Sequence, residues 1–153
     1  MYKPPWYEDE LVKAMPDLMG FAKLRAPNEH VAEDLVQETF YKMLALDRDL
    51  PRKQVRPYAF GVLRNLITDY FRSPTRSIIW DEEVEDSSDL SLELQRVVKA
   101  LGSMKEECQD VLSLAIFEHT QREIADVLDK PIGTIGSWLQ RCRRKLGEVL
   151  GLC

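Results

Sequence analysis

Residues 120–146 read TQREIADVLDKPIGTIGSWLQRCRRKL and decide the fold that the sequence predicts. Thr120 and Glu123 have the spacing of a capping box, in which each side chain bonds the other residue's backbone N–H where a helix begins. Pro131 cannot continue that helix and suits the opening of a second one. The segment therefore predicts a helix-turn-helix.

The second helix of this segment has two contrasting faces. At 100° per residue its apolar side chains group on one side, which we expect to be the packing face: Ile135, Leu139, Cys142 and Leu146. Its polar and basic side chains, with one Trp, group on the other: Thr134, Ser137, Trp138, Arg141, Arg144 and Lys145. Such an outer face suits the reading of base edges in the major groove of DNA. The alternative is an ordinary amphipathic hairpin whose basic face is solvated.

Length and composition suit one large or two small domains, because 153 residues with 44% hydrophobic content can bury a core. No run approaches the roughly 20 apolar residues of a membrane span, and MYKPPWYEDE does not resemble a signal peptide. We therefore expect a cytoplasmic protein without membrane insertion. Cys108, Cys142 and Cys153 are odd in number and lack C-x-x-C spacing, so reduced thiols are expected rather than a disulfide or zinc site.

The net charge of -5 is unevenly distributed. Residues 1–72 and 93–153 are each neutral, with 11 and 9 charges of either sign, whereas residues 73–92 hold six acids and one Arg. Within the first block, residues 1–47 carry -4 and residues 48–72 carry +4. The local sign of the charge, rather than the total, therefore indicates the partners of each segment.

Residues 1–10 are expected to form a loose lead-in. Apolar spacing predicts helices over residues 11–24, 31–46, 58–72, 90–101, 104–117 and the two helices of the opening segment, with Met15 and Ile116 on the packing faces of their helices. The helix over 31–46 carries an acidic and polar stripe opposite its apolar side: Asp34, Gln37, Glu38 and Tyr41. This stripe suits a basic partner helix better than DNA. A simply solvated face is the alternative.

Basic residues concentrate in the loop predicted over 47–56 and on the helix that Pro57 is expected to open. The polar side chains that suit phosphate and single-strand contact are Arg52, Lys53 and Arg56 in the loop, and Arg64, Asn65, Thr68 and Arg72 on the expected outer face of the helix. Tyr58 is a candidate for stacking on an exposed base. Residues 73–92 read as an acidic linker with a short apolar island at residues 78–80. The prediction is an all-α chain of two small helical domains, 1–72 and 93–153, joined by this linker.

Three motifs, in order, resemble bacterial extracytoplasmic-function sigma factors, group IV of the sigma-70 family. They are AEDLVQETF at residues 32–40, RNLITDYFR at 64–72, and EIA with PIGTI at 123–125 and 131–135. The resemblance spans about residues 8–149. It implies an alternative sigma factor, which binds core RNA polymerase, directs promoter-specific initiation and performs no chemistry itself.

The resemblance also implies a role for each surface. Asp34, Gln37, Glu38 and Tyr41 would meet the basic coiled coil of the polymerase's largest subunit. The loop and face of residues 47–72 would handle the minus-ten element and capture a flipped base of the non-template strand. The basic face of the last helix would read the minus-thirty-five element, and the acidic linker would thread channels built for RNA. An anti-sigma factor is an expected partner.

Some positions depart from the family pattern. Tyr58 stands where Trp is usual, and Glu118 and Asp129 replace turn glycines, where Asp tolerates a left-handed conformation better than most residues. Gly136 and Trp138 occupy recognition-helix positions that are commonly Lys or Arg. Gly136 costs about 1 kcal/mol relative to Ala in a helix interior. The upstream promoter element is therefore expected to be unusual.

Two other classes of function can be compared with the sequence. A free-standing helix-turn-helix regulator would use the same second domain, but it would ordinarily dimerise and would not need the acidic stripe. An enzyme is disfavoured because His30 and His119 are the only histidines, neither has metal-ligand spacing, and no phosphate-cradling Gly loop exists. No cofactor and no metal are expected.

Overall fold

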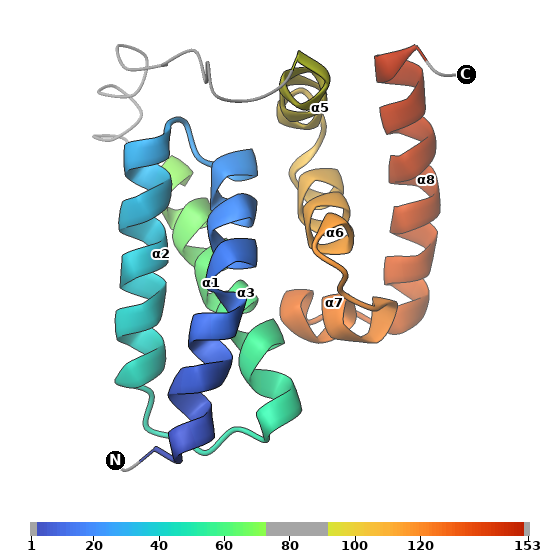
Figure 1. Ribbon diagram of the computed structural model, residues 1–153. Helices are drawn as coiled ribbons and strands as arrows, with labels where there is room; N and C mark the ends of the chain where they lie inside the picture. The colour runs from blue at the N-terminus through green and yellow to red at the C-terminus, as the bar shows by residue number, and fades with distance from the viewer. Residues whose placement is uncertain (1–2, 73–91, 152–153) are drawn as a thin grey trace. The chain divides into compact units, whose positions relative to one another are not determined.

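The computed structural model describes residues 3–72 and 92–151, in which all the regular secondary structure is helical. The helices form two compact units, α1–α3 and α5–α8 (Figure 1). The prediction of an all-α chain with two helical domains is confirmed. The acidic linker and the apolar island at residues 78–80 lie outside the described residues, so the predicted domain boundaries stay a prediction.

Unit 1 consists of α1 (Pro5–Arg25), α2 (Glu29–Leu44) and α3 (Arg52–Arg72), each of which contacts the other two (Figure 1). Phe21 and Phe60 meet edge to face at the centre, with ring centroids 5.4 Å apart. An aromatic pair of this kind adds about 0.5–1.5 kcal/mol beyond the burial of its surface. The core around them is aliphatic: Leu11, Leu18, Val36, Met43, Leu63 and Ile67.

The N-terminal segment differs from its prediction as a loose lead-in. Helix α1 already begins at Pro5, and Tyr7 is buried with its hydroxyl donating to the carbonyl of Met43 at 2.6 Å. The partner lies 36 residues away, so local sequence does not reveal it. Met15, expected on the packing face, is 43% exposed, and Ala14 is buried in its place.

Helix α3 begins at Arg52 rather than at Pro57, and the loop predicted over residues 47–56 is correspondingly shorter. Pro57 lies inside the helix and is buried. Its missing N–H forgoes one helical hydrogen bond to the carbonyl of Lys53. Arg52 and Arg56 join the turns before Pro57 to α1 through the carboxylates of Glu10 and Asp17.

Unit 2 consists of α5 (Leu92–Gly102), α6 (Glu106–Ile116), α7 (Gln121–Leu128) and α8 (Ile132–Leu150). Helix α8 contacts the other three. The core of unit 2 contains Leu101, Val111, Leu114, Ile124, Ile135 and Leu139. Ile116, predicted on the packing face of α6, is 48% exposed, whereas Leu114 is buried.

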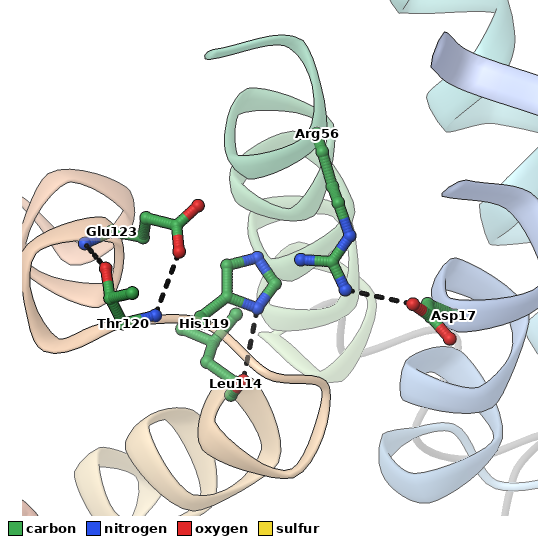
Figure 2. Close-up of polar contacts among 6 residues, drawn as sticks. All are labelled: Asp17, Arg56, Leu114, His119, Thr120 and Glu123. Carbon is green, nitrogen blue, oxygen red and sulfur yellow. Dashed lines mark hydrogen bonds and ion pairs between the residues drawn. The ribbon is translucent and has the colours of Figure 1, made fainter. Parts of the chain in front are cut away.

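The turns around α7 have the predicted chemistry. Thr120 and Glu123 form the capping box, with the Thr120 hydroxyl accepting from the Glu123 N–H and the Glu123 carboxylate accepting from the Thr120 N–H (Figure 2). Glu118 and Asp129, which precede and follow the helix, have φ angles of 64° and 54°. Between them, buried His119 donates from Nδ1 to the carbonyl of Leu114 at 3.1 Å (Figure 2). The predicted helix-turn-helix is present.

The expectation of reduced cysteines is wrong for two of the three. Cys108 of α6 and Cys142 of α8 form a disulfide with their Cα atoms 5.3 Å apart. The two residues are 34 positions apart, in no recognisable motif spacing, and only the packing of α6 on α8 brings them together. Cys153 lies outside the described residues.

Candidate nucleic-acid interface and acidic helix face

The acidic stripe of α2 is presented to solvent as predicted. Asn28 caps the helix by accepting from the Val31 N–H at 2.9 Å, and this fixes where the helix begins. The packing side of α2 is buried: Ala32, Leu35, Val36, Thr39 and Met43. The four stripe residues on the opposite side are all exposed: Asp34, Gln37, Glu38 and Tyr41. We call these four the acidic face.

Sequence reasoning did not include His30 in the acidic face. Its Nε2 lies 3.6 Å from the carboxylate of Asp34, one helical turn away, and both side chains are largely exposed. Only a protonated imidazole forms an ion pair there. Exposed pairs of this type contribute little to stability, so the Asp34 carboxylate can exchange this contact for one with a partner.

The polar residues predicted on α3 are not equally accessible. Lys53, Asn65 and Arg72 are exposed. Arg64 is half-buried, and its guanidinium lies 3.3 Å from the Asn65 side-chain oxygen. The prediction of Thr68 on the outer face is wrong, because Thr68 is 7% exposed and its hydroxyl donates to the carbonyl of Arg64.

Two of the predicted DNA-contacting arginines fasten α3 to α1. Arg52 bonds the Glu10 carboxylate and Arg56 bonds the Asp17 carboxylate, each at 2.9 Å (Figure 2 for the second pair). The hydrogen bond from Arg52 lowers the pKa of Glu10. Arg56 also lies over the Phe60 ring, 4.9 Å from its centroid. These contacts give both cations a structural role within unit 1.

A hollow of about 590 Å³ lies where the end of α2 and the turn after it face α3. It is lined by Glu38, Tyr41, Lys42, Ala45, Leu46, Asp47, Tyr58 and Val62. We call it the α2–α3 pocket. Arg48 lies over the Tyr58 ring at 5.5 Å, so a cation and an aromatic face meet beside it. The pocket thus joins the acidic face to the residues predicted to handle single-stranded DNA.

Four lining residues were not among the candidates from the sequence, namely Lys42, Ala45, Leu46 and Val62. Lys42 and Val62 lie on different helices, and no periodicity within either helix indicates that they share a cavity. Tyr41 and Tyr58 were singled out for different roles, and the fold places both on one pocket.

Helix α8 presents the strongest candidate surface for DNA. Ile135, Leu139 and Cys142 are buried beneath it. Ser137, Arg141, Arg144 and Lys145 are exposed on its other side, with Thr134 and Trp138 half-buried at the edge. Among the described residues, no carboxylate pairs with Arg141, Arg144 or Lys145. Unlike Arg52 and Arg56, these three cations are available to phosphates or bases.

Gly136 is not required by packing. A Cβ at this position would meet the side-chain oxygen of Gln121 at 3.3 Å, and Gln121 is an exposed, flexible side chain that can move.

Two protein-family models match the chain. The model for sigma-70 region 2 matches residues 11–77, and the model for sigma-70 region 4 matches residues 94–146. An extracytoplasmic-function RNA polymerase sigma factor, EcfG of Rhodopseudomonas palustris (strain TIE-1), is 29% identical over 93% of this chain and 83% of its own length. The chain belongs to the extracytoplasmic-function group of sigma factors.

Solved structures of sigma factors have the same fold as this sigma factor. The sigma factor RpoE from Bartonella quintana, solved with the anti-sigma factor NepR, superposes with a TM-score of 0.74 at 25% identity, covering 95% of this chain and 96% of that one. CnrH, solved with the cytosolic domain of CnrY, gives 0.75 at 26% identity, covering 95% and 88%. The region 2 match falls on the helices of unit 1, and the region 4 match on those of unit 2.

The described part of this sigma factor holds no helix that is long and apolar enough to cross a membrane. Its described residues also hold no cluster of three or more His, Cys, Asp or Glu side chains that could bind a metal ion.

Proposed function

We propose that this sigma factor binds core RNA polymerase and promoter DNA and directs initiation at a distinct set of promoters, without catalytic chemistry of its own and in the cytoplasm. The observation that carries the proposal is the exposed face of α8, where Arg141, Arg144 and Lys145 have no acidic partner among the described residues. Free cations on a helix-turn-helix release DNA counterions and reach base edges without first breaking an ion pair.

Each candidate surface receives one role in this proposal. The acidic face of α2 binds a basic helical element of core polymerase, since its charge repels DNA. Lys53, Arg64, Asn65 and Arg72 contact the minus-ten element. The α2–α3 pocket holds an unstacked base of that element, because the Tyr41 and Tyr58 rings offer stacking surfaces. The face of α8 binds the minus-thirty-five element.

The proposal does not assign DNA contacts to three residues that the sequence predicted to make them: Arg52, Arg56 and Thr68. Both arginines would have to exchange a carboxylate of α1 for a phosphate, and the Thr68 hydroxyl is committed to a backbone carbonyl. We assign them to the support of α3, on which the exposed residues lie.

Replacing Arg141 or Arg144 by Ala tests this proposal. A promoter is first selected from a library by transcription with reconstituted polymerase, and holoenzyme binding to it is then measured for each variant. Each lost base-edge contact should weaken binding by about 1–3 kcal/mol, or roughly 5- to 150-fold. Arg143→Ala is the matched control, because Arg143 is exposed on the same helix but lies roughly 160° around it from Arg141.

The control should lose much less affinity, because it removes the same charge from the flank of the helix. Wild-type affinity in Arg141→Ala and Arg144→Ala, or an equal loss in Arg143→Ala, would overturn the assignment of this face to DNA.

An anti-sigma protein is the second partner in the proposal. The support is that two sigma factors of the same fold were solved as complexes, one with the anti-sigma factor NepR and one with the cytosolic domain of CnrY. An inhibitor that covers polymerase-binding surfaces should compete with core polymerase. We therefore expect a protein captured with this chain from unstressed cells to be released when core polymerase is added, and capture of only polymerase subunits would contradict the expectation.

A further inference from the structure

The last turn of α2 and the chain that follows it are held by two residues from the start of the sequence, Tyr7 and Lys3. Helix α2 ends at Leu44, and the last carbonyls of a helix have no partner within the helix. The Tyr7 hydroxyl donates to the Met43 carbonyl at 2.6 Å. The Lys3 ammonium donates to the carbonyl of Leu46 and, at 3.0 Å, to that of Arg48. These bonds span 36 to 45 positions of sequence.

Lys3 and Tyr7 also support each other. The Lys3 ammonium lies 4.9 Å from the centroid of the Tyr7 ring, within the range of a cation–π interaction. A positive charge at this end of α2 is further favoured by the helix dipole. Burial raises the pKa of Tyr7, which keeps the phenol protonated and able to donate.

The same turn forms one wall of the α2–α3 pocket. Ala45, Leu46 and Asp47 line the pocket, and the Leu46 carbonyl accepts from Lys3. Neither Lys3 nor Tyr7 is among the lining residues, and Tyr7 is only 1% exposed. Neither residue therefore contacts a molecule in the pocket, and both bond the backbone beside it.

We propose that Lys3 and Tyr7 are positioning residues that fix the 45–48 turn in the shape with which the α2–α3 pocket receives an unstacked base of promoter DNA. The inference rests on the proposed function, which places a base in this pocket. Its physical basis is preorganisation: a wall held by two hydrogen bonds from Lys3, next to a helix end held by Tyr7, need not be ordered when the base enters. Loss of the bonds should weaken base capture while leaving contacts elsewhere on the DNA intact.

Lys3→Met tests the inference because it removes the ammonium and keeps an unbranched apolar stem. Lys13→Met is the matched control, since Lys13 lies on α1, is exposed, and among the described residues forms an ion pair with Glu10 alone, at 3.6 Å. Lys3→Arg should rescue much of the effect, because guanidinium also donates to carbonyls. Tyr7→Phe is a second, independent variant, which removes one hydroxyl and retains the buried ring.

Base capture is measured with the reconstituted holoenzyme. A single-stranded deoxyoligonucleotide is selected from a random pool by the wild type, and each nucleotide in turn is then replaced by an abasic one. A stacked base contributes roughly 5- to 150-fold to affinity, so one position should stand out in the wild type. For Lys3→Met, the ratio of the affinity for the intact strand to that for the strand abasic at this position should be at least threefold lower than for the wild type. The affinity for the abasic strand itself should equal that of the wild type.

The outcomes separate the two proposals. If no abasic position weakens the wild type, the base pocket itself is wrong. If one position does so equally in the wild type, Lys3→Met and Tyr7→Phe, the pocket stands and the positioning role is wrong. An equal loss of affinity for intact and abasic strands would also overturn it, because that pattern indicates lost phosphate attraction or poor folding. Unchanged affinity for core polymerase, which the proposal assigns to the acidic face of α2 in the same unit, shows that unit 1 of each variant is folded.

Discussion

Replacing Asp34 by Arg together with Gln37 by Ala is expected to weaken binding to core polymerase by about 100- to 1000-fold. The double change puts a positive charge where the acidic face meets a basic partner and removes a neighbouring amide. Juxtaposing like charges in an interface costs several kcal/mol, and each 1.4 kcal/mol is a factor of ten in affinity. The measurement is a competition titration of labelled wild type from core polymerase.

The variant should remain folded, because both side chains are exposed and the packing side of α2 is untouched. Surface changes of this kind usually alter the free energy of unfolding by no more than about 0.5 kcal/mol. The introduced Arg also lies one turn from Glu38, an arrangement that favours a helix. A loss of polymerase binding can then be attributed to the surface rather than to unfolding.

Glu33→Arg is the control for long-range charge. Glu33 is exposed on the same helix, next to Asp34 in sequence but about 100° around the helix from it. It makes the same change in net charge, so a much smaller loss is expected. Wild-type affinity in the double variant would refute the acidic face as a polymerase contact, and an equal loss in Glu33→Arg would show that only overall charge matters.

Local sequence was sufficient where the physical cause is local. The buried side of α2 follows from a helical period in which Ala32, Val36 and Met43 recur, and all three are fully buried. The capping box at Thr120 is set by residues three positions apart, and the left-handed turn at Asp129 needs only one tolerant residue. Each of these features depends on neighbours within a few positions, so it could be predicted.

Features that depend on distant partners were not predicted. Tyr7 is ordered by Met43, and the start of α3 is fastened by Glu10 and Asp17, some 40 positions before the arginines that bind them. The sequence does not show whether a basic side chain has a carboxylate partner in the folded chain. For this reason Arg56 and Arg141 were assigned alike to DNA, although the structure pairs the first with Asp17 and leaves the second without an acidic partner among the described residues.

The disulfide is the plainest case of a feature without a local signal, and it also has a large expected effect. Reducing the Cys108–Cys142 bond should lower the free energy of unfolding of unit 2 by about 2–4 kcal/mol. Its two cysteines are 34 positions apart, and a loop of this length constrains the unfolded chain by about 4 kcal/mol in the chain-entropy model. How far the bond is closed depends on the redox poise around the protein, so this stability varies with it.

Hydrogen exchange of the full chain, with and without reductant, measures this effect unit by unit. The most protected amides of α6 and α8 should exchange roughly 30- to 900-fold faster after reduction, which corresponds to 2–4 kcal/mol. Amides of α1–α3 serve as an internal control and should not respond, because unit 1 contains no cysteine. The double variant Cys108→Ser with Cys142→Ser should match the reduced protein in either condition.

Cys153→Ser is the matched control, and it should keep the full response to reductant. Thiol titration of the denatured, unreduced chain should find one free thiol in the wild type and none in Cys153→Ser. Three free thiols, with identical exchange in both conditions, would refute the bond. When the disulfide forms, it links the buried side of α8 covalently to α6 through Cys142, the residue next to Arg141. Oxidation therefore stiffens the packing beneath the proposed DNA-reading face.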